Sequence, residues 1–326
     1  MPTISVVIPA YNAEHTIIET IKSVQQQTFS NFELIVINDG STDRTLELVQ
    51  SVEDERLKIF SYENGGLPVA RNRGISHATG EFIAFLDADD LWTPDKLELQ
   101  LAALKQHPEA GLAYSWTCNM QEGKCVHRVE PKFEGNVYAN LLLWNFISNG
   151  SNPLIRRQVI QFVGEFEPTL KSGEDWDYWL RIAVRWSFIV VPKVHILYRL
   201  SSNSMSSKLE VMKEAGITVL ETAFCAAPPE LQYLKNHSLS NIHQYYAEVY
   251  LRDINNNTCD VNQVIQNLWK AVRLYPQTLI SRYTQTLVIK TLLIRLFSPE
   301  IVSMLLQFIS KIRKTRKLQL QELERF

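Results

Sequence analysis

The chain predicts an α/β fold: a doubly wound, mostly parallel sheet with helices on both faces, followed by an α-helical C-terminal region. Two observations support this. Short runs of β-branched and aromatic residues alternate with stretches of helical periodicity over residues 1–120, and these runs are continuously apolar. A continuous apolar run suits a strand that is covered on both faces, as in a parallel sheet. The alternation of strands with helices then indicates βαβ units.

Each expected element follows from one of these two patterns. The expected strands are residues 4–8, 32–37, 57–60, 81–86, 111–116 and, later, 188–192. The expected helices are residues 17–24, 46–52, a segment that opens at 93–95, and residues 137–146 and 176–186. Thr93-Pro94-Asp95 favours a helix start because proline fits the first turn and an acid fits the positive end of the helix dipole.

The periodicity changes after the polar segment SSNSMSSK, and from about residue 211 it is almost entirely helical. A chain of 326 residues is long enough for one large or two medium domains. We therefore expect a sheet domain over residues 1–210 and a helical region over residues 211–326.

The composition bounds the class of protein. A hydrophobic fraction of 45% and a charged fraction of 21% are ordinary for a folded chain, and a net charge of −2 gives no reason to expect a nucleic-acid partner. The N-terminus has no basic region before its short apolar run, and no stretch of about 18 apolar residues occurs, so we expect neither a secretory signal nor a spanning helix. The four cysteines lack CxxC spacing, so we expect a reduced, cytoplasmic chain; they are Cys118, Cys125, Cys225 and Cys259.

Polar clusters follow three of the expected strands: PAYN at 9–12, NDGSTD at 38–43 and DADD at 87–90. Ligands of open α/β sheets bind outside the carboxyl ends of the strands. One acidic turn after a strand is usually a helix cap, but three polar turns at one sheet edge predict a binding site.

The DADD cluster crowds Asp87, Asp89 and Asp90 together, and such carboxylates raise one another's pKa unless a positive group compensates. Asp-x-Asp places two carboxylates on one side of an extended backbone, where they can share Mg²⁺ or Mn²⁺ with phosphate oxygens. The glycine and glutamate of an EF-hand loop do not follow at the required offsets. A metal that bridges a diphosphate therefore fits this turn best.

The segment NGGLPVARNRGI, residues 64–75, adds a phosphate-recognition pattern. Gly65 and Gly66 permit close backbone approach, and Arg71 and Arg73 lie on the helix that follows. The alternative is a loop with a solvated basic helix face. Neither GxGxxG nor GxxxxGK[ST] is present, so the sequence predicts no dinucleotide fingerprint and no P-loop.

The segment SGEDWDYWLR, residues 172–181, carries Glu174, Asp175 and Asp177 at an expected helix start. Acids there can be simple caps of the helix dipole. Tryptophans surround them in the sequence, at Trp176, Trp179 and Trp186. Tryptophan beside carboxylate is typical of a carbohydrate pocket, in which a carboxylate can act as a general base.

Taken together, these motifs resemble the family 2 glycosyltransferases of GT-A fold over about residues 3–205. The matching segments, in the order of the family, are SVVIPAYNAE, VINDGSTD, NGGLPVARNRGI, FLDADD, NPLIRR with VGEFEP, and SGEDWDYWLR. The resemblance implies an inverting hexosyltransferase of cell-wall or polysaccharide biosynthesis. Its donor would be a nucleotide sugar, commonly UDP-linked, its acceptor a glycan or a lipid-linked glycan, and its cofactor Mn²⁺ or Mg²⁺.

The resemblance also implies a role for each matching residue. The nucleotide would lie against Pro9, Ala10, Tyr11, Asp39, Gly66, Arg71 and Asp87. Asp89 would bind the metal, Asp175 would be the catalytic base with Glu174 beside it, and Trp176 and Asp90 would line the acceptor and sugar pocket.

Two other functions remain open on the sequence. A nucleotidyltransferase would also use metal-bound carboxylates on an α/β sheet, but it has no evident use for GEDWDYW. A non-catalytic sugar-nucleotide-binding protein would be expected to have lost Asp89 or Asp175.

The C-terminal region carries apolar stretches at 286–297 and 300–309, followed by five basic residues between 311 and 317. This pattern predicts amphipathic helices that hold the protein at the inner face of the cell membrane without spanning it. The alternative is that these helices pack against the rest of the protein.

Overall fold

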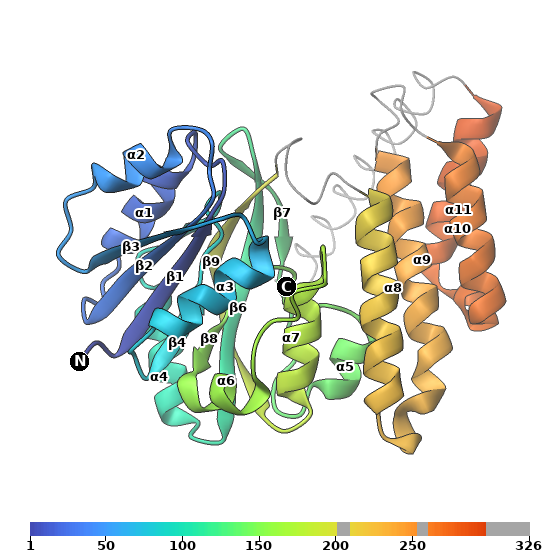
Figure 1. The fold of residues 1–326 in the computed structure, drawn as a ribbon. Helices are drawn as coiled ribbons and strands as arrows, with labels where there is room; N and C mark the ends of the chain where they lie inside the picture. The colour runs from blue at the N-terminus through green and yellow to red at the C-terminus, as the bar shows by residue number, and fades with distance from the viewer. Residues whose placement is uncertain (201–208, 253–259, 298–326) are drawn as a thin grey trace, which may run out of the picture. The chain divides into compact units, whose positions relative to one another are not determined.

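The computed structural model describes residues 1–200, 209–252 and 260–297. The chain divides into two compact units, Met1–Gln232 and Tyr233–Phe326. The first holds the sheet and the second is helical in its described part (Figure 1).

The first unit is built on one nine-stranded sheet with the order β3-β2-β1-β4-β8-β6-β9-β5, and β7 pairs with β6. The strands are β1 (Ile4–Ala10), β2 (Phe32–Asp39), β3 (Leu57–Tyr62), β4 (Phe82–Phe85), β5 (Leu91–Trp92), β6 (Ala110–Gln121), β7 (Lys124–Val129), β8 (Leu154–Arg156) and β9 (Ser187–Arg199). The block β3-β2-β1-β4 is parallel throughout, and β6 and β9 are also parallel. The predicted mostly parallel α/β sheet is confirmed; β5, β7 and β8, which pair antiparallel, were not expected.

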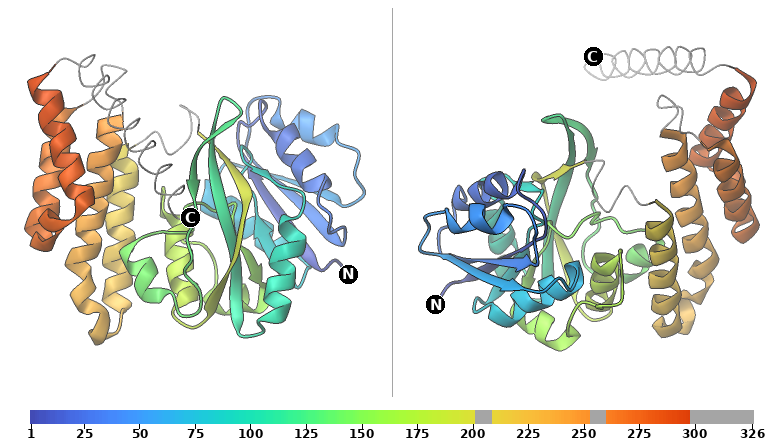
Figure 2. Two further views of the ribbon diagram at one scale, coloured as in Figure 1. Left: turned by 180° about the vertical axis from the view of Figure 1, so that it is seen from behind. Right: turned by 45° about the horizontal axis from the view of Figure 1, so that its top comes forward.

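Helices cover both faces of this sheet, and alternate residues of a strand point toward one face or the other. The helices are α1 (Ile17–Gln25), α2 (Thr45–Gln50), α3 (Leu67–His77), α4 (Lys96–Gln106), α5 (Tyr138–Leu143), α6 (Arg157–Val163) and α7 (Glu174–Ala183). Val6 belongs to the core cluster that also holds side chains of α1, α2 and α4. Val7 faces the other way, toward α3, where a Cβ on Gly74 would lie 2.2 Å from it. The two views of Figure 2 show the sheet from behind and tilted so that its top comes forward.

The first unit extends past the expected end at residue 210. Helix α8 (Leu209–Ala226) packs on α5 and α7, and the Tyr138 hydroxyl donates to the Ala223 carbonyl at 3.5 Å. Contacts therefore assign α8 to the unit that carries the sheet, although its sequence pattern resembles that of the helices that follow.

The short helix η2 (Pro229–Leu234) spans the boundary between the two units. The second unit then contains α9 (Lys235–Arg252), α10 (Val261–Leu274), η4 (Pro276–Ile280) and α11 (Arg282–Leu296). Its core joins these helices through Ala247, Leu251, Val264, Leu268 and Leu287. The helical character expected here is present. The basic residues between 311 and 317 and the apolar stretch 300–309 lie outside the described residues. No helix in the described part of the chain has the length and apolar character needed to cross a membrane.

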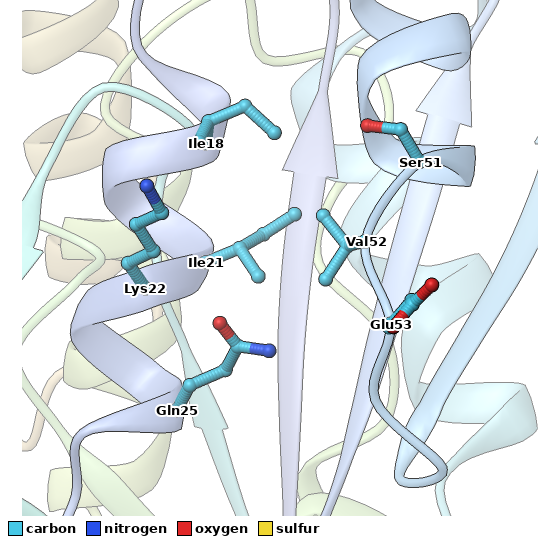
Figure 3. Close-up of a pocket in the computed structure, with 7 residues that line it drawn as sticks. All are labelled: Ile18, Ile21, Lys22, Gln25, Ser51, Val52 and Glu53. Carbon is cyan, nitrogen blue, oxygen red and sulfur yellow. The ribbon is translucent and has the colours of Figure 1, made fainter.

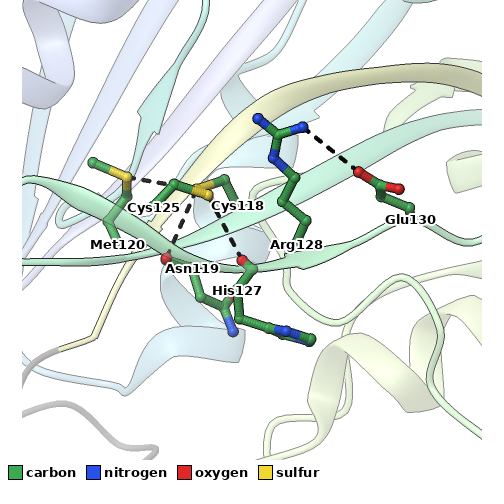
Figure 4. The surroundings of a disulfide bond; sticks show 7 residues. All are labelled: Cys118, Asn119, Met120, Cys125, His127, Arg128 and Glu130. Atoms are coloured by element: carbon green, nitrogen blue, oxygen red, sulfur yellow. Dashed lines mark hydrogen bonds and ion pairs between the residues drawn. A yellow bond between two sulfur atoms is a disulfide. The ribbon is translucent and has the colours of Figure 1, made fainter. Parts of the chain in front are cut away.

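Two of the four cysteines form a disulfide, which corrects the expectation of reduced thiols. Cys118 of β6 and Cys125 of β7 are joined across the β6–β7 hairpin, with their Cα atoms 5.7 Å apart (Figure 4). The turn at Glu122 and Gly123 brings the two strands together, and a separation of only 7 residues gave no such signal in the sequence. Cys225 is a free, exposed thiol.

Candidate active site

The structure brings the three polar turns to one edge of the sheet. They follow β1, β2 and β4, which are adjacent and parallel, with β1 in the middle. From β1 the chain passes to β2 and β3 on one side and then to β4 on the other. The switch in strand order therefore lies beside β1, where open α/β sheets bind their ligands.

The turns after β1 and β2 are tied together. The backbone N–H of Asn12 donates to the Ser41 hydroxyl at 3.1 Å, and the N–H of Thr42 donates to the Asn12 side-chain carbonyl at 2.8 Å. Tyr11, 54% exposed, follows the two buried residues Pro9 and Ala10 that end β1. Its exposed ring is thus available at this edge.

Asp39 ends β2 and is almost fully buried. Its carboxylate accepts from the backbone N–H groups of Gly65 and Gly66, at 3.0 and 2.8 Å, and from the Arg73 guanidinium at 2.6 Å. Gly66 has φ +87°, a conformation that other residues rarely adopt. Asp39 therefore orders the loop before α3, which leaves its carboxylate little capacity for the nucleotide contact that the family resemblance implies.

Asp90 is placed differently from the expectation that it lines a sugar pocket. It is completely buried, accepts from the Ser151 hydroxyl at 2.5 Å and accepts from the backbone N–H of Arg199 at 3.1 Å. Burial, together with the charges of Asp89 and Asp87, raises the pKa of Asp90 well above its usual range. Because its side chain turns into the protein, Asp90 supports the turn and cannot contact a sugar.

Asp89 fits a divalent cation. Among the described residues, no hydrogen bond from another residue reaches its carboxylate. Burial and then the charge of Asp87 raise its pKa to about 6, against the opposing charge of Arg199. A bound cation would relieve this crowding of negative charge.

The described part of the chain holds no complete set of protein metal ligands. No group of three or more His, Cys, Asp or Glu side chains within the described ranges could hold a metal alone. Mg²⁺ and similar ions commonly use one or two carboxylates and complete their shell with water and substrate phosphates. Asp89, with Asp87 two residues before it, offers this kind of incomplete set.

Arg71 joins the two acidic clusters. Its side chain is 1% exposed, and its two terminal nitrogens donate to Asp87 and to Glu174, each at 2.7 Å. A Cβ on Gly150 would lie 2.1 Å from the guanidinium, so glycine is required for this close approach. The acids on either side raise the pKa of Arg71 despite its burial, which keeps it charged. The expected contact with the nucleotide is thus replaced by a buried bridge between carboxylates.

Glu174 and Asp175 begin α7 but have different surroundings. Glu174 is buried against Arg71, whereas Asp175 accepts only the backbone N–H of Trp176, at 2.6 Å, among the hydrogen bonds of the described residues. Burial and then the charge of Glu174 raise the pKa of Asp175 to about 7, and Arg71 opposes this increase. A carboxylate with a pKa near neutrality suits a general base.

Trp176 does not line a pocket. It is 8% exposed, and its indole N–H donates to the Leu141 carbonyl of α5 at 2.9 Å. Successive residues of a helix point about 100° apart. Trp176 therefore turns away from Asp175 into the core, where Trp179 is also fully buried.

The structure also adds residues that the sequence did not single out. Thr20 donates to the carbonyls of Ala88 and Asp90, at 2.9 Å each, and the backbone N–H of Asp87 donates to the Ser151 hydroxyl at 3.1 Å. Arg199 contacts the same turn. No motif marks these positions, because they reach the turn from α1, the loop before β8 and the end of β9.

A surface cavity of about 290 Å³ lies elsewhere, between α1 and the end of α2 (Figure 3). Apolar side chains of Ile18, Ile21 and Val52 face it, with Lys22 and Glu53 at its margin. It shares no residue with the site described above. Its position gives no reason to connect it with the chemistry.

Comparison with known sequences supports the family resemblance. TuaG of Bacillus subtilis, named a putative teichuronic acid biosynthesis glycosyltransferase, is 32% identical over 212 residues, which cover 63% of this chain and 82% of TuaG. WfgD of Escherichia coli, named a UDP-Glc:alpha-D-GlcNAc-diphosphoundecaprenol beta-1,3-glucosyltransferase, is 45% identical over 102 residues, 31% of this chain and 40% of WfgD. A glycosyltransferase of Rickettsia conorii is 37% identical over 204 residues, 62% of this chain but only 33% of that protein, so the chain spans about a third of some relatives.

Solved structures share the fold. TarS 1–349 of S. aureus in complex with UDP-GlcNAc has a TM-score of 0.62 at 21% identity, covering 85% of this chain and 82% of that one. The mannosyltransferase PcManGT of Pyrobaculum calidifontis, in complex with GDP-Man and Mn²⁺, has a TM-score of 0.60 at 18% identity, covering 91% and 81%. The predicted GT-A fold is confirmed. The model of the glycosyltransferase-like family 2 matches residues 5–250, most of the chain, and the protein belongs to that family.

Proposed function

We propose that this protein is an inverting glycosyltransferase that moves a sugar from a UDP-linked donor to a hydroxyl of a glycan or lipid-linked acceptor. The observation that carries the proposal is the Arg71 bridge, which joins Asp87 at the sheet edge to Glu174 at the start of α7. Asp175, whose pKa is about 7, directly follows the bridged Glu174, which supports a position for it close to the proposed donor site.

The reaction follows from the states of these side chains. Ionised Asp175 accepts the proton of the acceptor hydroxyl as its oxygen attacks the anomeric carbon. The bond from that carbon to the nucleotide diphosphate breaks on the opposite face, which inverts the configuration. A divalent metal held by Asp89, with Asp87 beside it, would supply positive charge for the departing diphosphate. Glu174 contributes by positioning, through Arg71.

The nucleotide is proposed to lie along the turns after β1 and β2. Tyr11 offers an exposed ring there, and Pro9, Ala10, Asp39 and Gly66 shape the edge around it. The choice of UDP is supported by the UDP-Glc in the name of WfgD and by the UDP-GlcNAc complex of TarS. The name of TuaG supports a place in the synthesis of a cell-wall polysaccharide.

A screen of nucleotide sugars tests the proposal. The purified chain is incubated with UDP-, GDP- and TDP-sugars and Mn²⁺, and the released nucleotide is measured. We expect release from at least one UDP-sugar, and its loss when EDTA is added. Tight UDP binding without release from any sugar nucleotide, with or without added acceptor glycans, would favour a non-catalytic binding protein.

We also propose that the enzyme acts in the cytoplasm, at the inner face of the membrane. The acceptor in the name of WfgD is a diphosphoundecaprenol lipid, which supports such a place. In the described part of the C-terminal region, α11 exposes Ile289, Leu292 and Leu296 at 57%, 52% and 72%. These three lie along one helix face, opposite buried Leu287.

Flotation with anionic vesicles tests this location. The full chain should float at low salt and less at high salt, because basic residues near an anionic leaflet contribute about 1 kcal/mol each. Neutralising the five basic residues between 311 and 317 should weaken flotation. Absence of flotation at low salt would assign the C-terminal helices to packing.

A further inference from the structure

Arg199 lies at the acidic turn, residues 87–90. It donates to the backbone of Asp89 rather than to the carboxylate. It is the last residue of β9, and its side chain is 21% exposed. One terminal nitrogen donates to the backbone carbonyl of Asp89 at 3.0 Å, and the other pairs with Glu19 of α1. Its own backbone N–H donates to Asp90 at 3.1 Å.

Side chains from other parts of the first unit hydrogen-bond to successive backbone groups of this turn. Thr20 holds the carbonyls of Ala88 and Asp90, Ser151 accepts the N–H of Asp87, and Arg199 holds the carbonyl of Asp89. With these groups held, the backbone fixes the direction of the Cα–Cβ bond of Asp89, from which its carboxylate extends.

The two cations near this turn act differently. Arg71 donates directly to the carboxylate of Asp87, whereas Arg199 donates to the carbonyl of Asp89. A guanidinium bound to the Asp89 carboxylate would compete with a metal for the same oxygens. Arg199 compensates charge without occupying those oxygens.

We propose that Arg199 is a positioning residue for the metal ligand Asp89. It fixes the backbone that carries this carboxylate and keeps the carboxylate itself available. The inference rests on the proposed metal role of Asp89. Residues behind metal ligands typically change metal affinity about 10- to 100-fold when they are substituted.

The experiment measures Mn²⁺ binding directly. Free Mn²⁺ is followed by electron paramagnetic resonance during titration of the full chain with UDP present, and UDP binding without metal is measured by calorimetry. Arg199→Met should weaken Mn²⁺ binding about 10-fold or more. UDP binding without metal should stay within about twofold, since Arg199 is proposed to act through Asp89 alone. Arg199→Lys should restore part of the loss, because lysine keeps the charge and a donor but lacks the planar fork.

Arg56→Met is the matched control. Arg56 is 27% exposed and pairs with Asp54 at 2.8 Å, close to the burial of Arg199, but it lies before β3. It should leave Mn²⁺ binding unchanged at a comparable cost in melting temperature. Glu19→Gln, which removes the ion pair and keeps the contact with the Asp89 carbonyl, should have a small effect.

Several results would overturn the inference. Unchanged Mn²⁺ binding in Arg199→Met would show that the carbonyl contact is dispensable, and equal weakening in Arg56→Met would reduce the effect to general destabilisation. A matching loss of UDP affinity without metal would assign Arg199 to the nucleotide instead. If the native chain binds no Mn²⁺ with UDP, the metal role of Asp89 fails as well. Release of nucleotide in the sugar screen would still support the transferase.

Discussion

The acidic turn at 87–90 and the start of α7 share an arrangement of carboxylates, but we propose different functions for them. Each has one carboxylate held by Arg71, which is Asp87 in the turn and Glu174 in the helix. Each also has a neighbouring carboxylate outside that bridge: Asp89 in the turn and Asp175 in the helix.

The two unbridged carboxylates differ in their neighbours. Burial and then the charge of Asp87 raise the pKa of Asp89 to about 6, against the charge of Arg199, and burial and then the charge of Glu174 raise the pKa of Asp175 to about 7, against the charge of Arg71. A metal ligand must lose its proton when the cation binds, and a base must be able to take a proton near neutral pH. The proposed roles therefore follow from position rather than from this pKa difference: Asp89 lies in the turn after β4, and Asp175 lies at the start of α7.

Among the variants that test this comparison, Asp89→Ala is expected to have the largest effect. We expect it to abolish the metal-dependent part of UDP binding, because the turn then loses the carboxylate that is free for a cation. Calorimetry with and without Mn²⁺ measures this, and Asp175→Asn should retain the metal effect as its control. UDP binding that stays equally tight in Asp89→Ala, with a full response to Mn²⁺, would exclude Asp89 as the ligand.

Asp175→Asn should lower turnover at least about 100-fold, since it removes the proton acceptor and keeps the shape. The affinity for UDP should barely change. Glu174→Gln is the matched variant, and it should retain more activity because Glu174 acts through Arg71. Near-normal transfer by Asp175→Asn together with an inactive Glu174→Gln would reverse the two roles.

The next largest effect is expected on the pH dependence of kcat/KM. A base works when it is ionised, so the value should rise with pH through about 7, the pKa of Asp175. Glu174→Gln removes a negative charge next to Asp175 and leaves Arg71 in place. The rise should therefore move to lower pH. A rise that stays in place in Glu174→Gln would mean that another group controls it.

The smallest expected effect is on stability. Because the pKa of Asp175 is raised in the folded state to about 7, the native chain holds this proton where the unfolded chain has lost it. The free energy of unfolding contributed by this group then falls as pH rises from about 4 to about 7. Asp175→Asn should raise the melting temperature by about 2–4 °C near pH 8, for a gain of about 1 kcal/mol, and should change little near pH 4.

Asp177→Asn is the control on the same helix. Asp177 is paired with Arg181 at 2.9 Å, so its removal should lower the melting temperature slightly. Thermal melts of both variants at the two pH values make the measurement. A lower melting temperature of Asp175→Asn near pH 8 would show that the ionised carboxylate stabilises the folded state, which contradicts a raised pKa of Asp175.

The interior of the sheet and the edge that carries the polar turns could be predicted from the sequence. The runs at residues 4–8, 32–37 and 57–60 are continuously apolar because helices cover both faces, and they form β1, β2 and β3. The polar turns come directly after strands, and parallel strands bring their ends together. The short antiparallel strands β5 and β8 were not predictable, since two or three residues carry no periodicity.

The sequence by itself determined the α/β class, the family and the positions of the acidic clusters, because all of these depend on residues that are close along the chain. The tertiary structure decided which acids are bridged and which are free. Arg71 and Glu174 are 103 residues apart, and Arg199 and the Asp89 carbonyl are 110 residues apart. Burial of Asp90, Trp176 and the α8 surface also depends on such distant contacts. Local patterns cannot report them, because the pKa and the exposure of a side chain are set by whatever the fold places beside it.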